Sequence, residues 1–243
     1  MATHRGWRSL VAPVAVATVA AVLLAGGLLW AGGAAGRDGS KSPAAQVQSK
    51  PQHDYGPAPS YTLTDQNGDR VSSDRLDGKV QIVSFLFPYC TTDCPILARD
   101  LARLQHTLAA KGLAKKTAIV TFNVDPGGPS PRQLSEFLRQ YGAHADPATA
   151  KVPWYFLTGS KKQIRHAVRD GYHVAYWKVR GAEEEGAEHP NKLANRVDPG
   201  YDVKHAEVIY LVDGTGEIRT RLDSTSQANP KTVVHALRKV MRR

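Results

Sequence analysis

The two cysteines, Cys90 and Cys94, are the residues whose type and spacing point most directly to chemistry. Two thiolates four positions apart on a helical turn point the same way, and soft thiolates favour copper(I) or zinc. Such a pair can also exchange between dithiol and disulfide. A purely structural disulfide is the third interpretation, but closing so short a loop adds only about 2 kcal/mol of stability. A metal site and a redox pair are therefore the leading hypotheses. A metal site needs a further ligand from elsewhere, because two ligands rarely complete one.

The elements on either side of the cysteines indicate how they are held. Residues 79–87 are almost wholly apolar, as expected of a strand buried on both faces. Asp93 is expected to cap the helix that follows, with Pro95 in its first turn. Leucines then recur at helical spacing, at Leu97, Leu101, Leu104 and Leu108. The cysteines thus fall near a helix N-terminus, where unpaired N–H groups and the helix dipole favour thiolate over thiol.

Strands and helices alternate along the rest of the folded part. An Asn-Gly turn near residue 67 predicts an early hairpin, and Gly214-Thr215-Gly216 predicts another near the end. Further strands are expected at 117–124, 152–158, 174–179, 207–213 and 217–223. Further helices are expected to begin at Ser130-Pro131, Ser160 and Asn229-Pro230. This order predicts an α/β fold, a mixed sheet with helices on both faces. Residues 181–200 lack periodicity and are expected to form a long surface loop.

The N-terminal part has a different composition from the rest. Residues 10–31 are an uncharged apolar run, and as a helix they span about 33 Å, enough for a bilayer core. Arg5 and Arg8 precede the run, so residues 1–9 are expected in the cytoplasm and the remainder outside it. Residues 32–60 are predicted to be a flexible tether, and residues 61–243 the folded domain. The prediction is a single-pass protein of the cell membrane with an extracytoplasmic domain; a cleaved signal peptide is the alternative.

The basic residues are not arranged for nucleic acid. The formal net charge is +10, but lysines and arginines are spread over several segments, with no basic stripe interleaved with stacking aromatics. A mildly basic solvated surface is the expected result, and no nucleic-acid partner is predicted.

One of the nine histidines has the context of a third ligand. His205 lies directly before the apolar strand expected at 207–213, near the end of the sheet where loops gather. An ordinary surface histidine is the competing interpretation. His189 and the acidic run 183–185 could touch a metal, but a solvated loop is the preferred interpretation for them.

Taken together, these motifs resemble the Sco/SenC family of membrane-anchored copper-binding proteins that help assemble cytochrome c oxidase. The resemblance covers the chain from about residue 61 to its end. The matching positions are Phe85, Phe87, Cys90, Cys94-Pro95, Asn123-Val124-Asp125-Pro126, Pro131, His205 and Tyr210-Leu211-Val212-Asp213. Two positions and one segment depart from the family pattern: Thr91 stands where the family usually has proline, Ala206 where it usually has a hydroxyl residue, and 127–131 replace an Asp-x-x-x-Asp-Thr-Pro region.

The resemblance implies a thioredoxin-like fold and one copper ion, Cu(I) or Cu(II), held by Cys90, Cys94 and His205. It also implies delivery of that copper to the dinuclear copper site of the oxidase subunit, or reduction of the cysteines of that site. Other copper chaperones or thioredoxin-like reductants are further implied partners. Because the cysteines must be reduced to bind metal, copper loading and disulfide formation exclude one another.

Two enzyme classes are alternatives to the metallochaperone function. The first is a metal-free thiol–disulfide oxidoreductase using Cys90 and Cys94 as a redox-active pair. The thioredoxin-like reductases carry a proline before the last inner strand, and here His205 and Ala206 occupy that neighbourhood, which favours metal. The second is a peroxiredoxin-like peroxidase, whose motif does not fit because Pro88 is only two residues before Cys90.

Overall fold

The computed structural model describes residues 55–180, 200–224 and 226–242. The predicted N-terminal tail, the membrane anchor, most of the tether and nearly all of the loop predicted at 181–200 lie outside these ranges. Within them, no helix is both long and apolar enough to cross a membrane. The last residues of the predicted tether run beside the turn at residues 214–216, where the Ala58 N–H donates to the Gly216 carbonyl at 2.8 Å.

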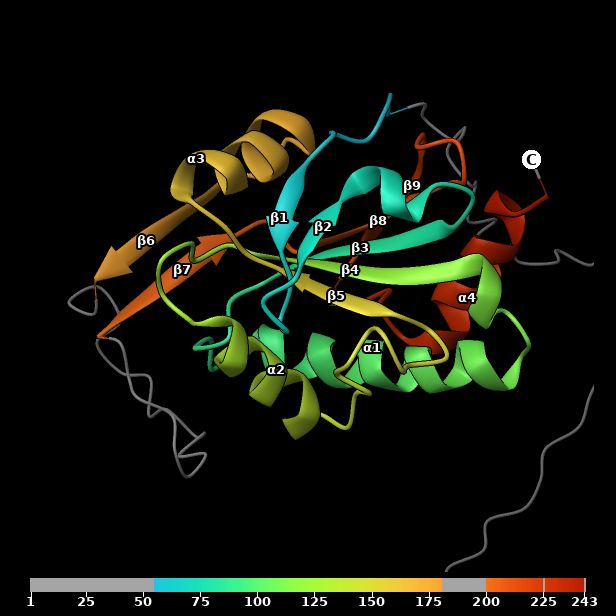
Figure 1. Cartoon of the computed structure of the whole chain (residues 1–243), viewed down its shortest axis with the longest axis horizontal. Coiled ribbons are helices and arrows are strands. Elements are labelled where there is room, and N and C mark those ends of the chain that lie inside the picture. Colours follow the sequence, from blue (N-terminus) through green and yellow to red (C-terminus); the bar gives the residue numbers. More distant parts are fainter. Residues whose placement is uncertain (1–54, 181–199, 225, 243) are drawn as a thin grey trace, which may run out of the picture. The chain divides into compact units, whose positions relative to one another are not determined.

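A five-stranded mixed sheet forms the centre of the domain (Figure 1). Its strand order is β5-β4-β3-β8-β9. The strands are β3 (Val80–Leu86), β4 (Thr117–Asn123), β5 (Trp154–Leu157), β8 (Val208–Val212) and β9 (Ile218–Asp223). β3, β4 and β5 are parallel, while β8 runs antiparallel to β3 and β9 antiparallel to β8. Every residue of β3 and of β4 is buried, as their continuous apolar sequences predict.

Helices cover both faces of this sheet, as predicted. In Figure 1, α1 and α2 lie below the sheet and α3 lies above it. The helices are α1 (Asp93–Ala110), α2 (Pro131–Gln140), α3 (Lys161–Ile164), its π-helical continuation (Arg165–Gly171) and α4 (Pro230–Val240); short 3₁₀ turns occur at Ser73–Leu76 and Ala114–Lys116. Ser130, Ser160 and Asn229 cap their helices through the side chain, as expected. The predicted cap at Asp93 is wrong: Thr92 is the N-cap, without a side-chain cap hydrogen bond, and Asp93 is the first helical residue.

In the described part of the chain, two hairpins lie outside the central sheet. The Asn-Gly turn joins β1 (Thr62–Thr64) to β2 (Arg70–Ser72), as predicted, with Gly68 at a positive φ of 90°. The other pairs β6 (Tyr176–Arg180) with β7 (Tyr201–His205) in an antiparallel two-stranded sheet. The strand expected at 174–179 therefore exists but does not join the central sheet, and β7 was not predicted at all.

Aromatic side chains fill the core between the sheet and the α3 layer. The Phe122 ring lies 5.2 Å from Tyr61, 5.9 Å from Phe85 and 5.5 Å from Tyr172, measured between ring centroids. Tyr172 stacks in turn on Tyr210 of β8 at 5.6 Å. These contacts join β3, β4, β8 and the segment after the π-helix into one core.

Candidate functional site

The two cysteines lie between the end of β3 and the second residue of α1, in a segment (residues 87–94) that we call the cysteine turn. Cys90 is in the turn after β3, and its N–H donates to the Phe87 carbonyl at 3.0 Å. Cys94 is the second residue of α1, on the face that packs against the core. Both are free thiols, with Cys90 7% and Cys94 2% exposed. The strand-to-turn-to-helix arrangement predicted for them is confirmed.

His205 reaches the same place from the far end of the sequence. Its Nε2 lies 3.7 Å from the Cys94 Sγ, across 111 residues of chain. Its Nδ1 lies 3.3 Å from the Ala206 carbonyl, which can only accept, so in the neutral ring this contact assigns the proton to Nδ1. Nε2 then presents a lone pair toward the cysteines, as a metal ligand would. His205 lies shortly before β8, as expected, and it is also the last residue of β7, which was not predicted.

The thiols differ in acidity because of where they lie. The hydrogen bond from Cys94 lowers the pKa of Cys90 to about 6, against the opposing effect of burial, with help from Thr92 and from backbone N–H groups at the start of α1. The same bond to Cys90, together with burial, raises the pKa of Cys94 well above its ordinary value. The reduced pair at neutral pH is thus a Cys90 thiolate beside a protonated Cys94.

We expect alkylation of the reduced protein to select Cys90 and to follow a titration near pH 6. With that pKa, about 90% of Cys90 is thiolate at pH 7, against about 3% for an ordinary cysteine, and the fraction falls as the pH drops below 6. Mass spectrometry of iodoacetamide-treated protein, sampled from pH 4 to 9, measures both the site and the midpoint. A midpoint above pH 8, or equal labelling of Cys94, would refute this assignment.

Two further residues at this site were missed by sequence reasoning. Tyr201 and Lys178, one from each strand of the β6–β7 hairpin, both contact the carboxylate of Asp125, at the end of β4. A signal for β7 was present in the alternation of Tyr201, Val203 and His205 with Asp202 and Lys204, which has the period of a half-buried strand.

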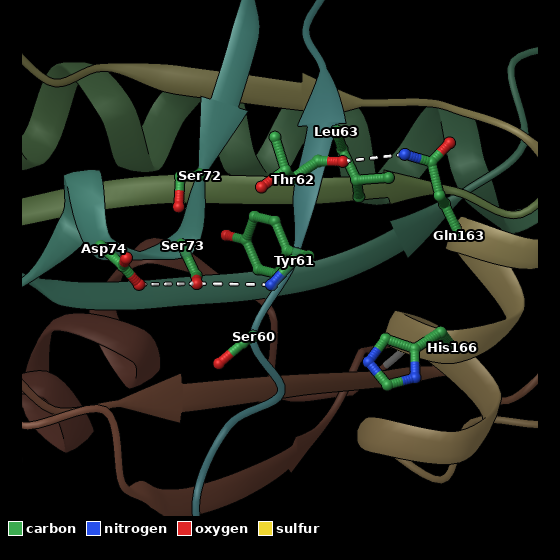
Figure 2. A pocket seen from close by; sticks show the side chains of 9 residues that line it. All are labelled: Ser60, Tyr61, Thr62, Leu63, Ser72, Ser73, Asp74, Gln163 and His166. Atoms are coloured by element: carbon green, nitrogen blue, oxygen red, sulfur yellow. Dashed lines mark hydrogen bonds between the residues drawn. The ribbon is translucent and has the colours of Figure 1, made fainter.

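The rest of the described chain adds no second candidate centre. In the described ranges, no group of three or more His, Cys, Asp or Glu side chains is already arranged to hold a metal ion, and Cys90, Cys94 and His205 are no exception. A groove of about 450 Å³ lies between β1, the turn after β2 and the α3 layer, and neither cysteine nor His205 lines it (Figure 2). Its walls are held by Gln163 Nε2 donating to the Thr62 carbonyl and by the Tyr61 N–H donating to Ser73 Oγ. His189 and residues 183–185 lie outside the described residues.

Comparison with solved structures shows which fold this is. The chain matches a SCO1/SenC family lipoprotein from Bacillus anthracis with a TM-score of 0.59 and 21% identity, over 76% of this chain and 95% of that one. It matches Arabidopsis thaliana ScoI, solved with copper bound, with a TM-score of 0.58 and 24% identity, over 76% and 98% of the two chains. The thioredoxin-like Sco fold predicted from the sequence is confirmed.

Comparison by sequence adds the family. The chain is 30% identical over 125 residues to the SCO1 protein homolog of Bacillus subtilis, a match that covers 51% of this chain and 61% of that protein. It is 28% identical over 180 residues to an SCO2-like protein of Rickettsia conorii, covering 73% and 74% of the two. The SCO1/SenC family model matches residues 49–242, which include the cysteine turn, the end of β4 and the β6–β7 hairpin, and the chain belongs to that family.

Proposed function

We propose that this protein is a copper chaperone that binds one copper ion through Cys90, Cys94 and His205. The observation that carries the proposal is the 3.7 Å approach of His205 Nε2 to Cys94 Sγ, from an element remote in sequence, beside a second thiol. Two sulfurs and one imidazole nitrogen suit copper(I), and they accept copper(II) when a weak further ligand is added. The Cys90 thiolate is already formed at neutral pH, so less proton release opposes binding at that position.

Relatives support the choice of metal. Family members from Arabidopsis thaliana and yeast have been solved with copper bound. The shared family and the shared fold make copper the best-supported ion here. Zinc accepts the same donor types, so the choice of copper rests on these relatives and not on the ligand set.

Copper is cargo in this proposal, and its destination is the dinuclear copper site of cytochrome c oxidase. The proposed location, on the outer side of the cell membrane behind an anchor at 10–31, is the side on which a tethered domain can reach a membrane-bound oxidase subunit. Donation of the metal and reduction of the recipient's cysteines are both open to a dithiol that can bind copper or form a disulfide.

The second candidate is a metal-free thiol–disulfide oxidoreductase. It is favoured by the hydrogen bond between the two thiols, which lowers the pKa of Cys90 and raises the pKa of Cys94, as a nucleophilic thiolate and its resolving partner require. His205 separates the two candidates, since thiol exchange by the cysteines does not use it.

The test mixes the purified full chain with an oxidase copper-subunit domain that lacks copper. In one arm the protein carries one equivalent of copper and the domain is reduced; in the other the protein is reduced and metal-free and the domain is oxidised. Wild type is expected to transfer copper, while H205A is expected to lose transfer and keep thiol exchange. If wild type transfers no copper, while wild type and H205A both exchange thiols rapidly with the domain, the oxidoreductase is left as the function.

A further inference from the structure

We propose that Lys178 and Tyr201 are positioning residues, which fasten the β6–β7 hairpin to the end of β4 and so hold His205 against the cysteines. They do so through one buried carboxylate, that of Asp125. Where copper is concerned, this inference rests on the proposed function.

The fastening point is a fully buried charge. Asp125 has no exposed surface, yet it carries a carboxylate. Tyr201 Oη donates to its Oδ2 at 2.6 Å, and Lys178 Nζ forms an ion pair with its Oδ1. A buried charge is costly unless it is paired and hydrogen-bonded, so both partners are held strongly to this spot. Asp125 itself is fixed, because its N–H donates to the Asn123 side chain at 3.1 Å.

Because of the register of the hairpin, the contacts of Lys178 and Tyr201 with Asp125 also determine where His205 lies. Lys178 pairs with Val203, and Tyr176 pairs with His205. Cross-strand partners and alternate residues share one face of an antiparallel pair, so Lys178, Tyr201 and His205 all project from the face on which Val203 is buried. When that face is fastened to β4, the imidazole is aimed at the cysteine turn.

The clamp that Lys178 and Tyr201 form on Asp125 also touches the cysteine turn directly. The Tyr201 ring stacks on Phe87 at 5.9 Å between centroids, and Phe87 accepts the hydrogen bond of the Cys90 N–H. Lys178 Nζ lies 3.9 Å from the centroid of the Tyr201 ring, so each clamp residue also supports the other. Gly128 leaves the space this needs, since a Cβ there would stand 1.8 Å from Asp125 Oδ2 and 3.1 Å from Tyr201 Oη.

The test compares K178M and Y201F with K178R and K204M in the full chain. K178R keeps the charge and is the conservative rescue. K204M removes a lysine from the opposite face of the same hairpin, where Lys204 Nζ lies 3.1 Å from the Asp202 carboxylate. Three quantities are measured: hydrogen exchange of the 201–205 amides, the NMR contact between the His205 ring and the Cys94 β-protons in metal-free protein, and copper affinity with the nitrogen signature of copper(II) in electron paramagnetic resonance.

K178M and Y201F are expected to speed hydrogen exchange of 201–205 by about tenfold or more and to weaken the contact between His205 and Cys94. They are expected to lower copper affinity by about 10- to 100-fold with an altered nitrogen signature, while K204M and K178R stay near wild type. Circular dichroism checks that each variant folds, and Y201F is the milder change should K178M unfold.

Unchanged exchange and an unchanged contact between His205 and Cys94 in both clamp variants would overturn the inference. So would faster exchange with wild-type copper affinity and spectrum. Failure of wild type itself to bind copper would instead overturn the proposed function. The exchange rates and the proton contact in metal-free protein would still decide whether the clamp positions His205.

Discussion

H205A is expected to weaken copper binding by the reduced protein by more than about 100-fold. Replacing a residue that only orients a ligand typically costs 10- to 100-fold in metal affinity, and loss of the ligand itself should exceed that. The two cysteines would remain, so weak binding should persist and the thiol chemistry should be intact. Competition against a copper(I) chelator of known affinity, under reducing conditions, measures the change.

His106 provides a matched control for this substitution. It is also a histidine, on the exposed side of α1, and its Nε2 lies 2.9 Å from the Gly142 carbonyl, away from the cysteines. H106A is therefore expected to bind copper as wild type does. A loss of affinity below about threefold in H205A, or equal losses in the two variants, would contradict the proposed ligand set.

F122A is expected to lower the free energy of unfolding by about 3–5 kcal/mol. Phe122 is fully buried on β4, and its ring contacts those of Tyr61, Phe85 and Tyr172 at 5.2–5.9 Å, so truncation leaves a cavity that the rigid sheet cannot close. Urea unfolding followed by circular dichroism measures the change.

The matched control for this prediction is another aromatic residue outside the core. Trp177 is 57% exposed on β6, and W177A is expected to shift stability by no more than about 0.5 kcal/mol. F122L, which keeps most of the buried volume, is expected to lose less than about 1.5 kcal/mol. A loss below about 1 kcal/mol in F122A would show that this aromatic cluster is not the core of the domain.

Local patterns were sufficient to predict the five strands of the central sheet, but not the order in which they pair. β3 and β4 are continuous apolar runs because both of their faces are buried, and the serine and asparagine caps begin α2, α3 and α4 as expected. The cysteine turn followed from the same logic, since it lies between a recognisable strand and a recognisable helix. The cap of α1 was misplaced by one residue because Thr92 and Asp93 are both residue types that favour the N-cap, and residue type alone does not choose between them.

The surroundings of His205 could not be predicted in the same way. β6 and β7 are separated by 20 residues, so their pairing is a non-local contact that no short window of sequence contains. The carboxylate of Asp125 meets Lys178 and Tyr201 across 53 and 76 positions, which depends on the register of the hairpin. The neighbours of His205 in the sequence indicated it as a candidate metal ligand. The direction in which its Nε2 points follows only from the tertiary structure.

X-ray absorption at the copper edge of the loaded, reduced protein is the most direct test of the proposed centre. We expect one copper per chain with two sulfur neighbours and one imidazole nitrogen, and loss of that nitrogen in H205A with the sulfurs retained. A copper without sulfur neighbours, or an imidazole signal that survives in H205A, would contradict binding by Cys90, Cys94 and His205.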